Sequence, residues 1–154
     1  MSKTQAGGVL SSAEFVAPKR LIKRIFIHCS ASDNPKHDDI FVIRQWHLER
    51  GFNDVGYHFF IKFDGTIQRG RNIERTPAAQ EGNNTATIAI CCAGLSQFTK
   101  AQFISLRWLA QAIHAAIPKA TFHGHCEVNP HKTCPVFAYK TVLGLDSKGG
   151  LITT

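Results

Sequence analysis

The hydrophobic pattern of the chain alternates between short apolar runs and longer segments with helical spacing. An isoleucine-rich run such as residues 21–29 is typical of a buried strand. The dipeptide Asp64-Gly65 lies between two strand-like segments and predicts a tight turn. Taken together, the pattern predicts five strands, at residues 21–29, 56–63, 66–69, 86–92 and 120–125.

Apolar residues recur at helical spacing in two places. The first helix is expected to begin after Asp38 or Asp39, either of which can cap it, and to stop near Gly51. The second helix has the clearer start, because Thr99 and Gln102 have the spacing of a capping box. Residues 137–143 predict a short closing helix.

These elements predict an α/β fold with a single domain, in which helices flank a central mixed β-sheet. We expect this domain to span residues 20–146, between a flexible lead-in at 1–19 and a flexible tail at 147–154. Residues 71–85 are polar and predict a long loop inside the domain. Loops of that length are often functional.

Composition limits the class of partner. The 154 residues are 44% hydrophobic and 19% charged, as expected for a globular domain. The formal net charge of +7 favours a polyanionic partner, such as nucleic acid, an anionic membrane face or an acidic cell-wall polymer. The basic residues are spread along the chain, with one local cluster at residues 19–24, so we expect no specific binding of nucleic acid.

The cysteines indicate synthesis in a reducing compartment. Their number is five, and Cys91 and Cys92 are adjacent, which does not fit a disulfide framework. We therefore expect reduced thiols and synthesis in a cytoplasm. The N-terminal segment has no apolar core of a signal peptide, and no run approaches the length of a membrane span. Export would then need a separate factor.

The candidate chemistry lies at the ends of the first and last strands. His28 ends the first, His125 ends the last, and Cys134 follows in the next loop. Two imidazoles and one thiolate leave a fourth position open, as in catalytic zinc sites. Spacing alone also allows three unrelated residues, because the chain has eight histidines and no short zinc motif.

Several ordered motifs resemble one family over most of the chain, from about residue 24 to about residue 142. The chain resembles the zinc-dependent N-acetylmuramoyl-L-alanine amidases, which include phage lysozyme-type amidases and peptidoglycan recognition proteins. The matching text is Ile27-His28-Cys29-Ser30-Ala31, Ile43-Arg44-Gln45-Trp46-His47, Gly51-Phe52, Asp54-Val55-Gly56-Tyr57-His58-Phe59, Asp64-Gly65-Thr66, Gly70-Arg71, and His125 with Lys132-Thr133-Cys134-Pro135.

The resemblance implies a site and a reaction. The family's ligands to a single Zn²⁺ ion fall on His28, His125 and Cys134, and its catalytic residues fall on Tyr57 and Lys132. The implied reaction is hydrolysis of the amide between N-acetylmuramic acid and L-alanine in peptidoglycan.

The chain departs from the family in two places. Residues 77–80 stand where the family has a Gly-Ala-His-Ala block, with Gln80 at the position of the histidine. We predict substrate contacts from Gln80, Asn84 and His58. The spacing of the ligands is one residue longer than in related phage enzymes, which leaves His123 as an alternative ligand, on the opposite face of the strand.

The resemblance favours a monomeric, bacteriolytic phage endolysin. It would be made in the host cytoplasm and act on the cell wall after release by a separate factor, aided by attraction to an anionic envelope. A bacterial recycling or remodelling amidase is the near alternative. A recognition protein that binds peptidoglycan without cutting it is a second class, although such relatives typically lack the thiol. Inhibition of an RNA polymerase, known for some phage amidases, is a third.

Overall fold

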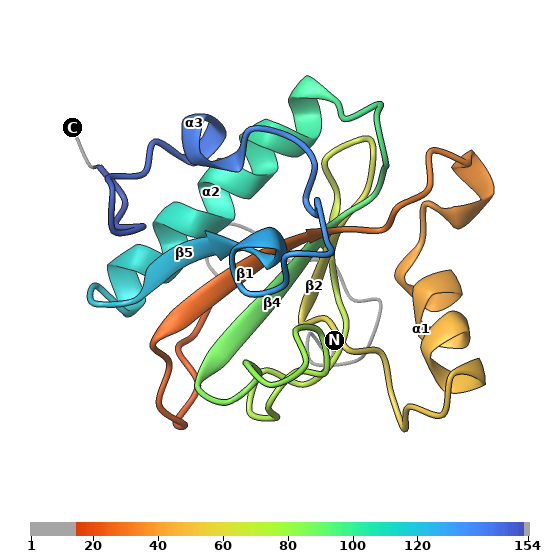
Figure 1. Ribbon diagram of the computed structural model, residues 1–154, viewed down its shortest axis with the longest axis horizontal. Coiled ribbons are helices and arrows are strands. Elements are labelled where there is room, and N and C mark those ends of the chain that lie inside the picture. Colours follow the sequence, from red (N-terminus) through yellow and green to blue (C-terminus); the bar gives the residue numbers. More distant parts are fainter. Residues whose placement is uncertain (1–14, 153–154) are drawn as a thin grey trace.

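The fold is a five-stranded mixed sheet with helices on both faces (Figure 1). A computed structural model describes residues 15–152 of the chain. The elements in chain order are β1 (Arg24–Cys29), the 3₁₀ helix η1 (Pro35–His37), α1 (Ile40–Glu49), β2 (Phe59–Ile61), β3 (Ile67–Arg69), β4 (Thr87–Cys92), α2 (Lys100–Ala116), β5 (Thr121–Gly124), the 3₁₀ helix η2 (His125–Glu127) and α3 (Tyr139–Leu143). The predicted α/β class and mixed sheet are confirmed.

The sheet has the strand order β3-β2-β4-β1-β5. Strands β2, β4, β1 and β5 run parallel, and β3 pairs antiparallel with β2 at one edge. The hairpin of β2 and β3 turns at Asp64-Gly65 as predicted, and Gly65 takes the positive φ of +90° that favours glycine. β1 is an inner strand, paired with β4 on one side and with the edge strand β5 on the other.

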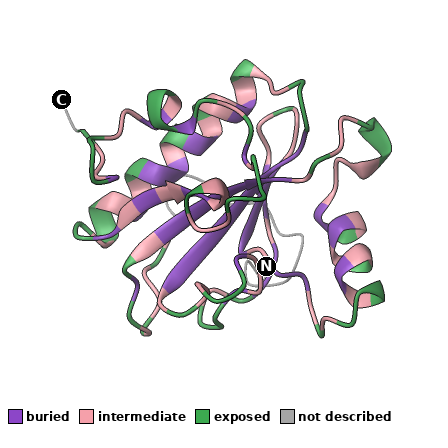
Figure 2. Ribbon diagram, viewed as in Figure 1, coloured by how far each residue is buried: buried purple, intermediate pink, exposed green. Residues whose placement is uncertain are grey.

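Both faces of the sheet are covered, because the strands alternate their side chains between two apolar clusters (Figure 2). Ile25 and Ile27 of β1 pack in the larger cluster with Leu106 and Leu109 of α2. The smaller cluster lies under α1, whose Ile40 and Ile43 pack with Phe60 and Cys91. His28 belongs to the second set by alternation, so it lies on the face of the sheet opposite α2.

Helix α2 begins as the sequence predicted. The Thr99 side chain accepts a hydrogen bond from the Gln102 backbone N–H at 3.1 Å, and Gln102 Oε1 accepts one from the Thr99 backbone N–H at 2.9 Å. The Gln102 side chain also donates to the carbonyl oxygens of Ala93, at 2.7 Å, and Ile61, at 3.2 Å. This buried amide therefore ties the helix to the ends of two strands.

Two expected boundaries are corrected. The strand predicted at 56–63 is only β2, because the turn already begins at Lys62, whose backbone N–H donates to Thr66. The last strand ends at Gly124, and His125 begins η2. Residues 1–14 and 153–154 lie outside the described residues.

The described parts of the expected lead-in and tail contact the domain. Phe15 packs against the larger cluster, and the Lys19 backbone N–H donates to Glu74 at 2.9 Å. Leu151 forms a bridge with Leu145 and packs on the same cluster. The flexibility expected for both segments stays a prediction. Among the described residues, no helix is long and apolar enough to cross a membrane.

We predict that Gln102→Leu lowers the free energy of unfolding by about 1–3 kcal/mol, because the Ala93 carbonyl oxygen loses the donor and the Thr99 backbone N–H loses the acceptor that Gln102 supplies. Gln111→Leu makes the same chemical change at an exposed position of α2 and is the matched control. Urea denaturation of both variants measures the difference. Equal stability of the two variants would show that the Gln102 hydrogen bonds are not important.

Candidate metal centre

The pairing of β1 with β5 brings two histidines together. Ile27 lies opposite Gly124 in the parallel register, so the residues that follow them in the chain, His28 of β1 and His125 of η2, are neighbours. Their ring centroids are 4.6 Å apart. His28 is buried, whereas His125 is half-buried at the start of η2.

Cys134 reaches the same place through the loop that follows η2. The Cys29 backbone N–H donates to Cys134 Sγ at 3.0 Å, and the Cys126 backbone N–H donates to the Cys134 carbonyl at 2.9 Å. The first of these bonds favours negative charge on the sulfur, although the hydrogen bond with the Cys29 thiol and burial together raise the pKa of Cys134 in the metal-free protein. The loop is thereby tied to the end of β1, next to His28.

The three side chains form a group that fits a zinc ion. Their ligand atoms lie within 4.8 Å of one another, and no other group of three His, Cys, Asp or Glu side chains in the described part of the chain lies this close. Zinc bonds of about 2.0–2.3 Å at tetrahedral angles place neighbouring ligand atoms roughly 3.3–3.7 Å apart. A small closing movement therefore satisfies the geometry, and two imidazoles with one thiolate suit zinc chemically.

Both histidines are held neutral, as metal ligands must be. Burial lowers the pKa of His28 to about 3, and the neighbouring His125 contributes to the shift. Burial and the charge of Lys132 lower the pKa of His125. Neutral imidazole offers a lone pair to a metal, so the site is prepared for binding at neutral pH.

The group lies at the base of a cleft of about 790 Å³ on the α1 side of the sheet. The end of α1, the loop residues Ala78, Ala79, Glu81 and Asn84, and most of residues 129–136 contribute its walls. Leu95 and Val136 add exposed apolar side chains at its rim. Such a mixture of polar and apolar walls suits a ligand that has both polar and apolar parts.

Tyr57 and Lys132, the predicted catalytic residues, both line this cleft. The Tyr57 ring lies 5.1 Å from His28 and 5.4 Å from His47, centroid to centroid. Burial raises the pKa of the Tyr57 phenol well above its ordinary value, so its hydroxyl is protonated at neutral pH and can donate. The side chain of Lys132 is exposed, and its charge acts on His125.

The predicted substrate residues are not all in the cleft. Asn84 lines it, although its side-chain oxygen accepts from the backbone N–H groups of Ala79 and Gln80. Gln80 is fully buried, and its Oε1 lies 2.8 Å from His28 Nε2. A buried amide cannot reach a ligand in the cleft, so the position of Gln80 gives no support to substrate contact.

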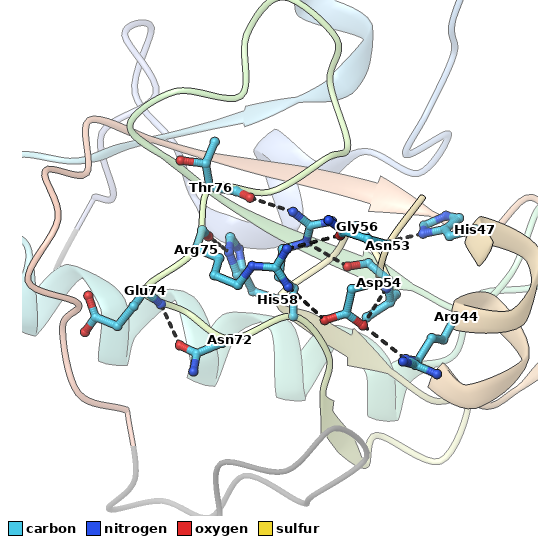
Figure 3. Close-up of polar contacts among 12 residues, drawn as sticks. Arg44, His47, Asn53, Asp54, Gly56, His58, Asn72, Glu74, Arg75 and Thr76 are labelled. Atoms are coloured by element: carbon cyan, nitrogen blue, oxygen red, sulfur yellow. Dashed lines mark hydrogen bonds and ion pairs between the residues drawn. The ribbon is translucent and has the colours of Figure 1, made fainter. Parts of the chain in front are cut away.

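His58 is also buried and lies in a separate polar network (Figure 3). Its Nδ1 accepts from the Ala89 backbone N–H at 3.1 Å, and its Nε2 donates to the Arg75 carbonyl at 2.8 Å. Arg75 in turn pairs with Asp54, which also pairs with Arg44. These bonds hold the loop after β3, so His58 has a structural position and is not brought to the cleft.

The alternative ligand His123 is occupied elsewhere. The expectation that it lies on the opposite face is wrong, because it pairs with Phe26, which shares the face of His28. The His123 ring contacts Thr121 Oγ1 at 2.6 Å and Glu127 at 2.9 Å, and it does not belong to the group of three. Glu127 also accepts from the Gly124 backbone N–H and from the Tyr139 hydroxyl. It therefore closes the 3₁₀ turn that carries His125.

Sequence reasoning did not assign His47 to the site. It lines the cleft from the last turn of α1, and its Nδ1 accepts from the Gly56 backbone N–H at 2.8 Å (Figure 3). This bond fixes the segment that carries Tyr57. The signal available in the sequence was the position of His47 at the end of the family motif Ile43-Arg44-Gln45-Trp46-His47.

Fold and site define a class, a single-domain α/β protein with a candidate His₂Cys metal centre in an open cleft. Residues 18–137 match the N-acetylmuramoyl-L-alanine amidase family, and the chain belongs to that family. It is 40% identical over 124 residues to the endolysin of Escherichia phage T7, an alignment that covers 75% of this chain and 82% of that protein.

Solved structures agree with this assignment. The chain is similar to the N-acetylmuramoyl-L-alanine amidase LysC from Clostridium intestinale URNW, with a TM-score of 0.69, 26% identity, and coverage of 94% and 93% of the two chains. Drosophila PGRP-LB shares the fold at 23% identity and a TM-score of 0.64, over 88% and 85% of the chains. The family predicted from the sequence motifs is confirmed.

We predict that the stability of the metal-free protein falls as the pH falls from about 6.5 towards 3. Burial, with added repulsion from Arg20 and Arg71, lowers the pKa of His58 to about 3, while the unfolded chain binds this proton at an ordinary pKa. Between these pH values only the unfolded state binds the extra proton. The free energy of unfolding therefore falls by up to about 1.4 kcal/mol for each pH unit and each such histidine.

Urea denaturation at several pH values tests the contribution of His58. In His58→Gln the slope of unfolding free energy against pH should be shallower between these limits, because one of the buried neutral histidines is gone. The same slope in wild type and variant would contradict this explanation.

Proposed function

We propose that the protein hydrolyses the amide between N-acetylmuramic acid and L-alanine of peptidoglycan with one zinc ion held by His28, His125 and Cys134. Family membership supports the reaction. The observation that carries the zinc site is the convergence of three donor atoms within 4.8 Å, at the base of the cleft that Tyr57 and Lys132 line.

The three ligands would leave one position open towards the cleft. When bound, zinc supplies a Lewis acid that polarises the amide carbonyl and lowers the pKa of water to about 7. The Cys29 N–H and the buried surroundings of His28 hold two of the ligands in place before any ion arrives. Such preorganisation limits the rearrangement needed on binding.

Lys132 and Tyr57 would act on the charge that develops during hydrolysis. As the amide carbonyl is attacked, its oxygen becomes negative, and the exposed ammonium of Lys132 can approach it. Tyr57 is protonated, so its hydroxyl can donate to the same oxygen or orient the attacking water. Both groups come from loops next to the metal ligands.

We propose that this activity lyses a bacterial host as part of a phage cycle. Related proteins of phages T7 and T3 are named endolysins, and the alignments cover 82% and 86% of their lengths. The formal charge of +7 supports association with an anionic envelope. A monomeric state, synthesis in the host cytoplasm with later action on the wall, and contact with an RNA polymerase stay predictions.

Digestion of purified peptidoglycan followed by mass spectrometry tests the reaction. The expected products are free stem peptides that begin with L-alanine, together with intact glycan strands. Chelation should abolish their release and added zinc should restore it. Cleaved sugars with intact amides would contradict the proposed function.

Metal analysis of Cys134→Ser tests the ligand set separately. The variant should lose zinc and lytic activity together, because a serine hydroxyl is a poor replacement for thiolate on this ion. Cys126→Ser, which changes a neighbouring thiol outside the group of three, should retain zinc. Full zinc content and full lysis in Cys134→Ser would refute the site.

We predict that Lys132→Ala keeps zinc but loses about 10²–10³-fold in kcat, the usual cost of one donor to a developing oxyanion. Lys140→Ala removes the same charge from α3, outside the cleft lining, and should retain turnover. Steady-state rates on soluble wall fragments measure both. Equal rates for the two variants would remove Lys132 from the mechanism.

A further inference from the structure

We propose that Gln80 is a positioning residue, which holds the proton of His28 on Nε2 and so presents His28 Nδ1 as the ligand atom for the metal. The inference deepens the proposed zinc function and rests on it. It gives a structural role to the loop residue that sequence reasoning had placed against the substrate.

The hydrogen bonds of the Gln80 amide fix which of its ends faces His28. Its Nε2 donates to Thr87 Oγ1 at 2.8 Å and lies 3.4 Å from the Asn83 carbonyl oxygen. Thr87 Oγ1 donates its own proton to the Asn84 carbonyl at 2.8 Å, so it can only accept from Gln80. Both neighbours of Gln80 Nε2 are therefore acceptors, and Oε1 is the end that faces His28.

The consequence for His28 follows from the chemistry of a neutral imidazole. One ring nitrogen carries hydrogen and the other carries a lone pair. Gln80 Oε1 has no proton to give, so the contact of 2.8 Å requires the hydrogen to be on His28 Nε2. The lone pair is then on Nδ1, which is left to bind the ion.

The backbone around Gln80 holds the amide in place. Asn84 Oδ1 accepts from the backbone N–H groups of Ala79 and Gln80, at 3.1 and 2.9 Å. The Asn83 backbone N–H donates back to the Gln80 carbonyl at 2.8 Å. Gln80 itself is 0% exposed, so water does not compete for its side chain. Asn84 thus supports the metal site indirectly, because it fixes the backbone that carries Gln80.

A reversed amide would have the opposite effect. Its NH₂ group would face His28 Nε2 and favour the hydrogen on Nδ1, which removes the lone pair from the ligand atom. The same reversal would place an oxygen against Thr87 Oγ1 and the Asn83 carbonyl. Thr87 therefore enforces the correct orientation from β4, without itself belonging to the group of three.

The first test reads the tautomer directly in metal-free protein labelled with ¹⁵N. Long-range ¹H–¹⁵N correlations distinguish a protonated Nε2 from a protonated Nδ1. Wild-type His28 should be protonated on Nε2, and Gln80→Met, which removes the acceptor with an unbranched side chain of similar length, should show a mixture. A wild-type His28 protonated on Nδ1 would overturn the proposal.

The second test measures zinc affinity by competition with a chromophoric chelator. Loss of such a partner behind a ligating histidine typically weakens metal binding by about 10–100-fold, which is the effect expected for Gln80→Met. Thr87→Val should also weaken binding, because the amide becomes free to turn. Thr87→Ser keeps the hydroxyl and should bind like wild type.

The variants separate a positioning role from a merely structural one. Unchanged zinc affinity in folded Gln80→Met would overturn the proposal, and equal affinities of Thr87→Val and Thr87→Ser would do the same. If Gln80→Met does not fold, the wild-type tautomer and the Thr87 pair still decide the question. Failure of wild type to bind zinc would refute the proposed function instead, since the tautomer is read without metal.

Discussion

The parallel pairing of β1 with β5 is the constraint on which the site depends. The register sets Ile27 opposite Gly124, so the two histidines that follow are side by side at the same edge of the sheet. Because successive side chains alternate between faces, a slip of one residue in β1 would turn His28 into the cluster under α2. The apolar side chains on both faces of the inner strand β1 specify its register and thereby the position of His28.

Loops complete the site, and each is tied to a strand by specific hydrogen bonds. The Cys29 N–H holds the sulfur of Cys134, while Gln80, anchored by Thr87 of β4, holds the ring of His28. His47 holds the segment of Tyr57 through the Gly56 N–H. The reactive groups therefore come from segments far apart in the sequence but share one rigid support, which is what a preorganised catalytic site requires.

Much of this was accessible from the sequence, for identifiable reasons. The capping box at Thr99 and Gln102 and the turn at Asp64-Gly65 depend on neighbours within a few residues, so local pattern predicted both. The ligand set came from ordered motifs, since spacing alone left it open among eight histidines. Burial was the missing information for Gln80 and His58. Both are polar residues in segments expected near substrate, and the packed loop placed them under the cleft or away from it.

The sequence by itself determined the class of fold, the family and the set of residues with the right chemistry, because these depend on periodicity, local turn signals and motif order. Only the tertiary structure decided which nitrogen of His28 is free, how Cys134 reaches it and which polar residues are out of reach of a ligand. Those properties depend on contacts between residues 52 to 105 positions apart, such as Gln80 with His28 and Cys134 with Cys29, and no local pattern encodes them.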